Sequence, residues 1–415
     1  MYDWANSVYT LVIGTAIFPI YYAAVMEGAG IDTLNIFGAQ IDTTAAYTFV
    51  IALAYLTVSV ATPYLSALSE VSGSKKTFMR ILVWLGSLSA MGMFWFVGER
   101  HWLGLVAPYF GTLGFAGSLV FYNSYLPEIA DPKDQDHLSA RGFALGYIGS
   151  VLLLIVSLAC IQNPAWFGLE DVGLITRYTF VAVAIWWAGW GEYSLVRLPE
   201  GHAVKVKEKG WIKAAYQQLW GVYLSFRERA GLQRFVIGFF FASAGIQTVI
   251  LIATLFGSEE LGLDASLMIL TIIVIQFLGV AGSYFFSWLS GRVGNIFGLL
   301  AASVVWVVVC IMAYFIDNAT QFIILGGTVG LVFGGLQSLA RSTYSKLLPE
   351  EGEHVTYFSF YDIAEKLATT LGMISVGWVI EWTGDMRATT LMLGLFFVIA
   401  ISIWMSIKHK QLQAL

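Results

Sequence analysis

Long uncharged stretches recur along this 415-residue chain, separated by short polar segments. A helix needs about 20 apolar residues to cross a bilayer. Ten stretches of at least 18 residues contain no Asp, Glu, Lys or Arg: 4–26, 43–69, 81–98, 101–127, 142–169, 235–258, 265–291, 293–316, 318–340 and 388–407. Two more, about 174–196 and about 355–380, are long enough but carry charged residues. The pattern predicts twelve transmembrane helices. It excludes a transmembrane β-barrel, whose strands alternate apolar and polar residues.

Basic residues are unequally distributed between the segments that connect these spans. The even-numbered segments and the C-terminal tail hold 18 Lys or Arg residues, whereas the odd-numbered segments hold 3. Because cytoplasmic loops carry the excess of Lys and Arg, the split predicts that both termini are cytoplasmic. Acidic residues gather in the odd-numbered segments, among them Asp42, Asp171 and Asp264.

Composition agrees with a membrane protein. Hydrophobic residues make up 58% of the chain and charged residues only 12%, whereas a soluble domain carries about 25% charged residues. So little charge does not cover a water-facing surface, and we expect a multi-pass integral protein of the cell inner (plasma) membrane. Cys160 and Cys310 both lie in apolar runs, which argues against a disulfide framework.

The two halves of the chain resemble each other. SYLPE (124–128) follows the fourth span and SKLLPEE (345–351) follows the tenth, and aligning Pro127 with Pro349 gives an offset of 222 residues. LSEVSGSKK (68–76) and LSGRVGN (289–295) follow the second and eighth spans, and aligning Gly73 with Gly294 gives an offset of 221 residues. Two agreeing offsets indicate a parallel repeat of six spans, the plan of the major facilitator fold, in which the substrate binds between the halves near the midplane.

We therefore expect an all-α protein with an N-terminal six-helix half at 1–196, a cytoplasmic linker at 197–230 and a C-terminal six-helix half at 231–415. The linker is first polar and basic (RLPEGHAVKVKEKG) and then amphipathic (WIKAAYQQLWGVYLSFRERAG). The amphipathic part predicts either a surface helix on anionic lipid or a solvated connection between the halves. We favour the solvated connection, and the alternative stays open.

LSEVSGSKK also resembles the loop motif of the major facilitator superfamily, Gly-x-x-x-Asp-Arg-x-Gly-Arg-Arg. Glu70 stands at the position of the acid, Gly73 at the second glycine, and Lys75 and Lys76 at the basic end. The second copy, at 289–295, keeps its glycine but lacks the acid.

Several longer segments are similar to signatures of one family within that superfamily, the vacuolar-effluxer-like family. They are YDWANS (2–7), VFYNSYLPEIA (120–130), SARGFALGYIGS (139–150), GGLQSLARSTYSKLLPE (334–350) and FSFYDIAEKLATTLG (358–372). The resemblance implies a secondary transporter related to fungal vacuolar amino-acid exporters linked to autophagy. Ala244 stands where the family usually has an acid in the seventh span, so a coupling role for that acid is not carried over.

The richest group of ionisable residues inside a span lies in the eleventh. Lys366 is about 16 Å from the predicted cytoplasmic end, near the middle of a core of about 30 Å. Asp362, four residues earlier, shares its face. This pair either only fixes the rotation of the helix or forms a substrate or proton site. Glu365 adds a surplus acid and favours the second interpretation. Gln247 in span seven and Gln337 in span ten are further substrate or proton candidates.

A second group of polar residues maps to the cytoplasmic ends of the spans. We predict that they form an inner gate, which comprises Asp3, Asn6, Glu70, Asn123, Glu128, Arg141 and Arg341. For Asp3 there is a simpler alternative, because an acid at a helix N-terminus can cap free N–H groups. That alternative does not cover Asn6, one turn further along.

The sequence contains no His-Glu-x-x-His, Gly-x-Ser-x-Gly, Cys-x-x-Cys or phosphate-binding Gly-Lys-Ser/Thr motif. We therefore expect no enzyme activity, cofactor, metal or nucleic-acid partner. A gradient must supply the energy, so the expected function is alternating-access transport of a small solute, coupled to protons, with an amino acid or similar zwitterion as substrate. The expected partners are this solute, protons and the lipid bilayer, and the expected state is a monomer. A lipid or amphiphile transporter of the same fold, or a non-transporting receptor or scaffold, are the alternatives.

Overall fold

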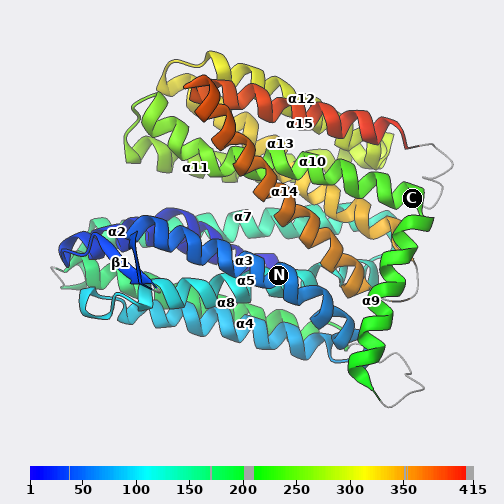
Figure 1. The fold of residues 1–415 in the computed structure, drawn as a ribbon, viewed down its shortest axis with the longest axis horizontal. Coiled ribbons are helices and arrows are strands. Elements are labelled where there is room, and N and C mark those ends of the chain that lie inside the picture. The colour runs from blue at the N-terminus through cyan, green and yellow to red at the C-terminus, as the bar shows by residue number, and fades with distance from the viewer. Residues whose placement is uncertain (37, 169–170, 201–209, 350–351, 353, 408–415) are drawn as a thin grey trace. The chain divides into compact units, whose positions relative to one another are not determined.

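A computed structural model describes residues 1–36, 38–168, 171–200, 210–349, 352 and 354–407. Among these residues, 12 helices are long and apolar enough to cross a membrane, which confirms the predicted number of spans (Figure 1). Hydropathy identifies them because a segment in lipid must satisfy its own backbone hydrogen bonds, and a continuous apolar helix does so.

The helices fall into two compact units. The first unit contains Met1–Tyr122 and Leu145–Ala215, and the second contains Asn123–Ala144 and Tyr216–Leu415. Residues 123–144 precede the predicted linker by more than fifty positions, yet they pack within the second unit.

The first unit is built mainly from α1 (Tyr2–Val8), α2 (Phe18–Gly28), α3 (Thr43–Ser72), α4 (Lys75–Gly92), α5 (Leu103–Asn123) and α8 (Val172–Arg197). Between α1 and α2 the first span is a π-helix, Tyr9–Ile17, where we expected one regular helix. A two-stranded antiparallel hairpin, β1 (Thr33–Ile36) and β2 (Ala39–Asp42), precedes α3.

The second unit is built from α6 (Leu126–Ile129), α10 (Ala230–Leu255), α11 (Ala265–Val293), α12 (Asn295–Phe315), α13 (Ala319–Leu347), α14 (His354–Thr383) and α15 (Met386–Met405). Three of the described helices contribute residues to both units: α7 (Pro132–Gln162), α9 (Trp211–Glu228) and α5, whose last residue, Asn123, belongs to the second unit. The predicted limits 142–169 for the fifth span are wrong at both ends, since α7 begins at Pro132 and ends at Gln162. Proline suits the first turn of a helix, where its missing N–H costs nothing.

Helix capping accounts for several of the acids in the odd-numbered segments. Asp42, Asp171, Asp264 and Asp385 each accept a hydrogen bond from a backbone N–H in the first turn of the helix that follows, and Asn318 does the same for α13. These five residues begin spans two, six, eight, ten and twelve, which all start in odd-numbered segments. The acids therefore satisfy helix N-termini outside the spans.

The internal repeat has a structural basis at its two glycines. Gly73 ends α3 with a φ of 66°, and Gly294 ends α11 with a φ of 89°. Residues with a side chain rarely adopt such positive φ angles. Each glycine thus stops the second span of its half and lets the third begin within two residues.

Candidate functional site

The ionisable residues of the eleventh span meet a residue of the seventh. On α14, the Nζ of Lys366 forms an ion pair with Oδ1 of Asp362, and both side chains are nearly buried, at 12% and 10% exposure. The Nε2 of Gln247 on α10 donates a hydrogen bond of 2.5 Å to Oε1 of Glu365. We call these four residues the α14 charge cluster. The structure thus brings together four of the five predicted substrate or proton candidates.

The α14 charge cluster holds more acid than base. Two carboxyl groups, of Asp362 and Glu365, accompany a single ammonium group. The second carboxylate oxygen of Asp362, Oδ2, is buried and accepts no hydrogen bond from any residue that the structure describes. A buried charge that is not fully paired is costly, so the cluster leaves room for a proton or a cationic group.

Close packing of α10 on α14 holds the cluster in place. A Cβ on Gly372 would overlap the Thr248 hydroxyl and the Ala244 carbonyl, so only glycine fits at this crossing. Nearer the start of α14, the rings of Tyr361 and Phe239 stack with their centroids 4.1 Å apart. Gln247 and Glu365 are therefore positioned by the packing on both sides of them.

The fifth candidate, Gln337, does not join the cluster. It is half-buried on α13 and forms no hydrogen bond with the other four residues in the part of the chain that the structure describes. Its role stays a prediction.

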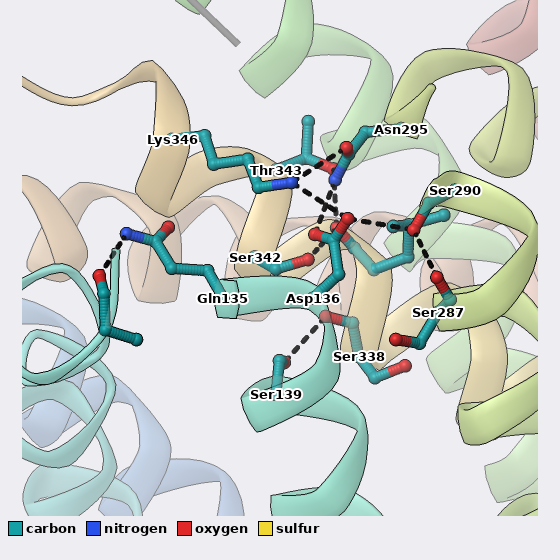
Figure 2. Close-up of polar contacts among 12 residues, drawn as sticks. Gln135, Asp136, Ser139, Ser287, Ser290, Asn295, Ser338, Ser342, Thr343 and Lys346 are labelled. Atoms are coloured by element: carbon teal, nitrogen blue, oxygen red, sulfur yellow. Dashed lines mark hydrogen bonds and ion pairs between the residues drawn. The ribbon is translucent and has the colours of Figure 1, made fainter. Parts of the chain in front are cut away.

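A second polar group surrounds the carboxylate of Asp136, in the first turns of α7 (Figure 2). Its Oδ2 accepts hydrogen bonds from Lys346 Nζ and Ser290 Oγ, each at 2.8 Å. Its Oδ1 accepts one from Asn295 Nδ2 at 2.7 Å. Lys346 also donates to Oδ1 of Asn295 at 3.0 Å. We call Asp136, Ser290, Asn295 and Lys346 the Asp136 network.

The Asp136 network ties together the ends of four helices. Asp136 lies near the start of α7, Ser290 near the end of α11, Asn295 at the start of α12 and Lys346 near the end of α13. The side chains of Lys346 and Asp136 are only 6% and 8% exposed. Both carboxylate oxygens are satisfied, so the ion pair meets the condition under which a buried pair is tolerated.

Arg341 forms a neighbouring polar group one turn and a half before Lys346 on α13. Its Nε donates to Ser139 Oγ at 3.0 Å, and its two terminal nitrogens donate to the Ser139 carbonyl at 2.9 Å and to Asn123 Oδ1 at 3.2 Å. The guanidinium carbon lies 4.3 Å from the ring centroid of Phe143. We call Arg341, Ser139 and Asn123 the Arg341 network. It joins two of the predicted gate residues.

The other predicted gate residues are dispersed. Glu128 lies in the second unit, with Oε1 3.7 Å from His354 Nδ1. Arg141 is exposed and forms no ion pair with another residue that the structure describes, so it does not join either network.

Asp3, Asn6 and Glu70 are buried within the first unit. The hydroxyl of Tyr122 on α5 donates to Oδ2 of Asp3. The N-cap position of α1 is Met1, and its side chain makes no capping bond. The interaction of Asp3 with α5 thus favours a tertiary role over the simple helix cap.

The sequence reasoning missed Asp136, Ser290, Asn295 and Lys346. Ser290 and Asn295 belong to the second copy of the loop motif, which is the signal that could have drawn attention to them. Asp136 precedes the uncharged stretch, which begins only at 142, so the hydropathy pattern places it in a connecting segment. Pro132 followed by acids is a helix-start signal that would have corrected this boundary.

Comparison with known proteins agrees with this architecture. The model of the vacuole effluxer Atg22-like family matches residues 1–413. The chain belongs to this family. Over 405 residues the Atg22-like chain is 29% identical to the uncharacterized MFS-type transporter YxiO of Bacillus subtilis, with 97% of this chain and 92% of that protein covered. Autophagy-related protein 22-1 of Penicillium rubens is 21% identical over 477 residues, covering 92% of this chain and 78% of the relative.

Solved structures show the same fold for this Atg22-like protein. The transporter FucP in its outward conformation superimposes with a TM-score of 0.70 at 12% identity, covering 98% of both chains. The proton:xylose symporter XylE gives a TM-score of 0.69 at 13% identity, with 98% of this chain and 95% of that chain covered. The protein is therefore a multi-pass membrane protein of the major facilitator superfamily and belongs to a family of transporters, not of enzymes.

Proposed function

We propose that this protein is a proton-coupled secondary transporter of a small zwitterion such as an amino acid, and that the α14 charge cluster is its substrate and coupling site. The observation that carries the proposal is the buried or half-buried set of two acids and one base inside a membrane span, with one carboxylate oxygen that accepts no hydrogen bond from the described residues. Ionisable groups inside a span are expensive and mark transport pathways.

The charges of the cluster suit a zwitterion and couple it to a proton. A substrate carboxylate would bind Lys366, which must then release Asp362. The freed carboxylate needs a new positive partner, either the substrate ammonium group or a proton. Glu365, which is held by Gln247, provides the second acid. Binding of solute and of a proton are therefore linked through the same ion pair.

The Asp136 and Arg341 networks supply a candidate gate for this transport cycle. Both are made of hydrogen bonds between helices, and the Asp136 network adds one ion pair; water can replace these contacts when the helices separate. We propose that they close the cytoplasmic end of the pathway in one state and break in the other. Asn123 and Arg341, predicted from the sequence, act in it together with Asp136 and Lys346.

The orientation and the proton coupling have separate support. The split of 18 against 3 basic residues supports cytoplasmic termini. Two solved neighbours are described as proton symporters, FucP and XylE, so the fold accommodates proton coupling. We place the protein in the cell inner membrane, and the expected monomer stays a prediction.

Uptake of labelled amino acids into proteoliposomes tests the proposal. Wild-type protein should accumulate at least one amino acid above empty vesicles when a proton gradient is imposed, and Lys366→Ala should abolish the uptake. Lys133→Ala is the matched control, because Lys133 is 77% exposed and pairs only loosely with Asp131, at 3.9 Å. Uptake of no amino acid by folded protein, or full uptake by Lys366→Ala, would contradict the proposal.

A further inference from the structure

Helix α9, Trp211–Glu228, is amphipathic and is not among the twelve helices apolar enough to cross a membrane. One of its faces packs on the start of α14. Gln218 Nε2 donates to Thr356 Oγ1 at 3.4 Å, the hydroxyls of Ser225 and Tyr357 are 2.5 Å apart, and the Phe226 ring lies 5.6 Å from that of Tyr357. This face fixes the helix to the transporter.

A different face of α9 carries large apolar side chains that are exposed. Tyr216, Trp220, Tyr223 and Leu224 are between 39% and 67% exposed. Successive helical residues turn by about 100°, so these four fall within about 100° of arc, on the side away from the buried Gln218 and Val222. The rings of Trp220 and Tyr223 pack together with centroids 5.3 Å apart. We call these four residues the aromatic stripe.

Basic residues bracket the aromatic stripe. Lys213 and Arg227 are exposed, lie on the same arc as the stripe and are separated by about 21 Å along the helix axis. Residues 205–229 contain six Lys or Arg residues and only two Glu. Long basic side chains at the ends of an apolar surface can reach lipid headgroups while their stems stay on the apolar side.

A third face of α9 carries small or polar residues, which can be exposed to water. Gln217, Gly221 and Glu228 are exposed and lie between the stripe and the buried face. Three faces of this kind are expected where protein, lipid and water meet. Tyr and Trp are enriched at that boundary, and an amphipathic helix with aromatic and basic residues lies in the plane of the interface.

We propose that α9 is an interfacial helix that seats its aromatic stripe in the surface of the membrane and binds anionic phospholipid headgroups through Lys213 and Arg227. The net positive charge of 205–229 is complementary to anionic lipid, which attracts basic residues near its surface. The solvated connection that the sequence favoured leaves the stripe unexplained.

The test uses the full-length protein, with Cys160→Ser and Cys310→Ala, in vesicles. An environment-sensitive fluorophore is attached at Trp220→Cys or, if that variant does not fold, at Leu224→Cys. Gln217→Cys is the matched control on the water-facing side. Brominated phosphatidylcholine quenches the probe where it contacts lipid, and iodide quenches it where it contacts water.

We expect brominated lipid to quench the probe at 220 at least about threefold more than the probe at 217. The difference should grow when phosphatidylglycerol is included, and Lys213→Gln with Arg227→Gln should remove that growth. Equal lipid quenching at 220 and 217 would overturn the interfacial position. Lipid quenching at 220 that does not change when phosphatidylglycerol is included would overturn the anionic-lipid assignment. A probe at 220 that is shielded from both quenchers would assign the stripe to a protein partner instead. None of these readouts depends on transport.

Discussion

Replacing Lys346 by Met tests the Asp136 network. The variant keeps the length of the side chain but removes the ammonium group that donates to Asp136 and Asn295. The carboxylate of Asp136 then stays buried with only its Ser290 and Asn295 donors. Removing one partner of a buried ion pair costs about 3 to 5 kcal/mol. At about 1.4 kcal/mol for each factor of ten, the closed arrangement of the four helix ends loses about two to three and a half orders of magnitude in population.

The assay is the reaction rate of a buried cysteine with an impermeant maleimide. Ser342→Cys serves as reporter, since Ser342 on α13 is fully buried and appears beside the network in Figure 2. In a background without Cys160 and Cys310, Lys346→Met should raise the labelling rate by about a hundredfold or more, until opening is complete. Because labelling needs only access to water, the result does not depend on knowing the substrate.

Two controls sharpen this prediction. Lys133→Met removes an exposed lysine from the helix that also carries Asp136. The ion-pair partner of Lys133, Asp131, is itself 76% exposed. Exposed pairs are worth about 0 to 1 kcal/mol, so labelling should change by less than about fivefold. The double variant Asp136→Leu with Lys346→Met removes both charges and should restore much of the protection. Equal labelling in Lys346→Met and Lys133→Met would refute the claim that the network holds these helices together.

Three further predictions concern other parts of the molecule. Arg341→Lys keeps the charge, but one ammonium group cannot reach both Ser139 and Asn123 in the arginine geometry, so labelling in the same assay should rise about tenfold, less than for Lys346→Met. Gly372→Val should destabilise the packing of α10 on α14 by about 1 to 3 kcal/mol and lower the midpoint of thermal unfolding. The control Gly377→Val should not lower it, because a Cβ at Gly377 meets nothing within 4 Å. Equal midpoints in the two variants would count against the close crossing. Hydrogen bonds from Ser266 Oγ and the Leu267 N–H lower the pKa of Asp264 below its usual value, so the cap favours the folded helix above the ordinary pKa and is lost as pH falls through the lowered one. The protection factors of the amides at the start of α11, which correct for the slower intrinsic exchange in acid, should therefore fall at acid pH in the wild type and should not fall in this way in Asp264→Asn.

The sequence predicts the features that depend on residues close to one another along the chain. Lipid requires continuous apolar helices, which fixed the number of spans, and the i, i+4 spacing of Asp362 and Lys366 predicted their ion pair. Helix capping by acids could also have been read from the chain. A span count based on uncharged stretches places the boundary of α7 too late, because Asp136 is charged and yet buried inside the helix.

Contacts that depend on which helices pack together were not predictable. Gln247 and Glu365 are 118 residues apart, and Asp136 is 154, 159 and 210 residues from its three partners. No sequence period connects such positions. Gln337 and Arg141 show the same limit: their positions along the predicted spans made them candidates, yet position along a span does not say which side chains they will contact, and neither joins the groups described above.

The most direct test of the central claim is solute-driven proton movement in proteoliposomes loaded with a pH-sensitive dye. A gradient of a transported amino acid should change the internal pH in vesicles with wild-type protein. Glu365→Gln, which removes the surplus acid but keeps an acceptor for Gln247, should transport the solute without moving protons or should lose transport. Glu381→Gln, an exposed acid on the same helix, should behave like the wild type. Proton movement that is unchanged in Glu365→Gln, or absent from wild-type vesicles that do take up solute, would contradict coupling at the α14 charge cluster.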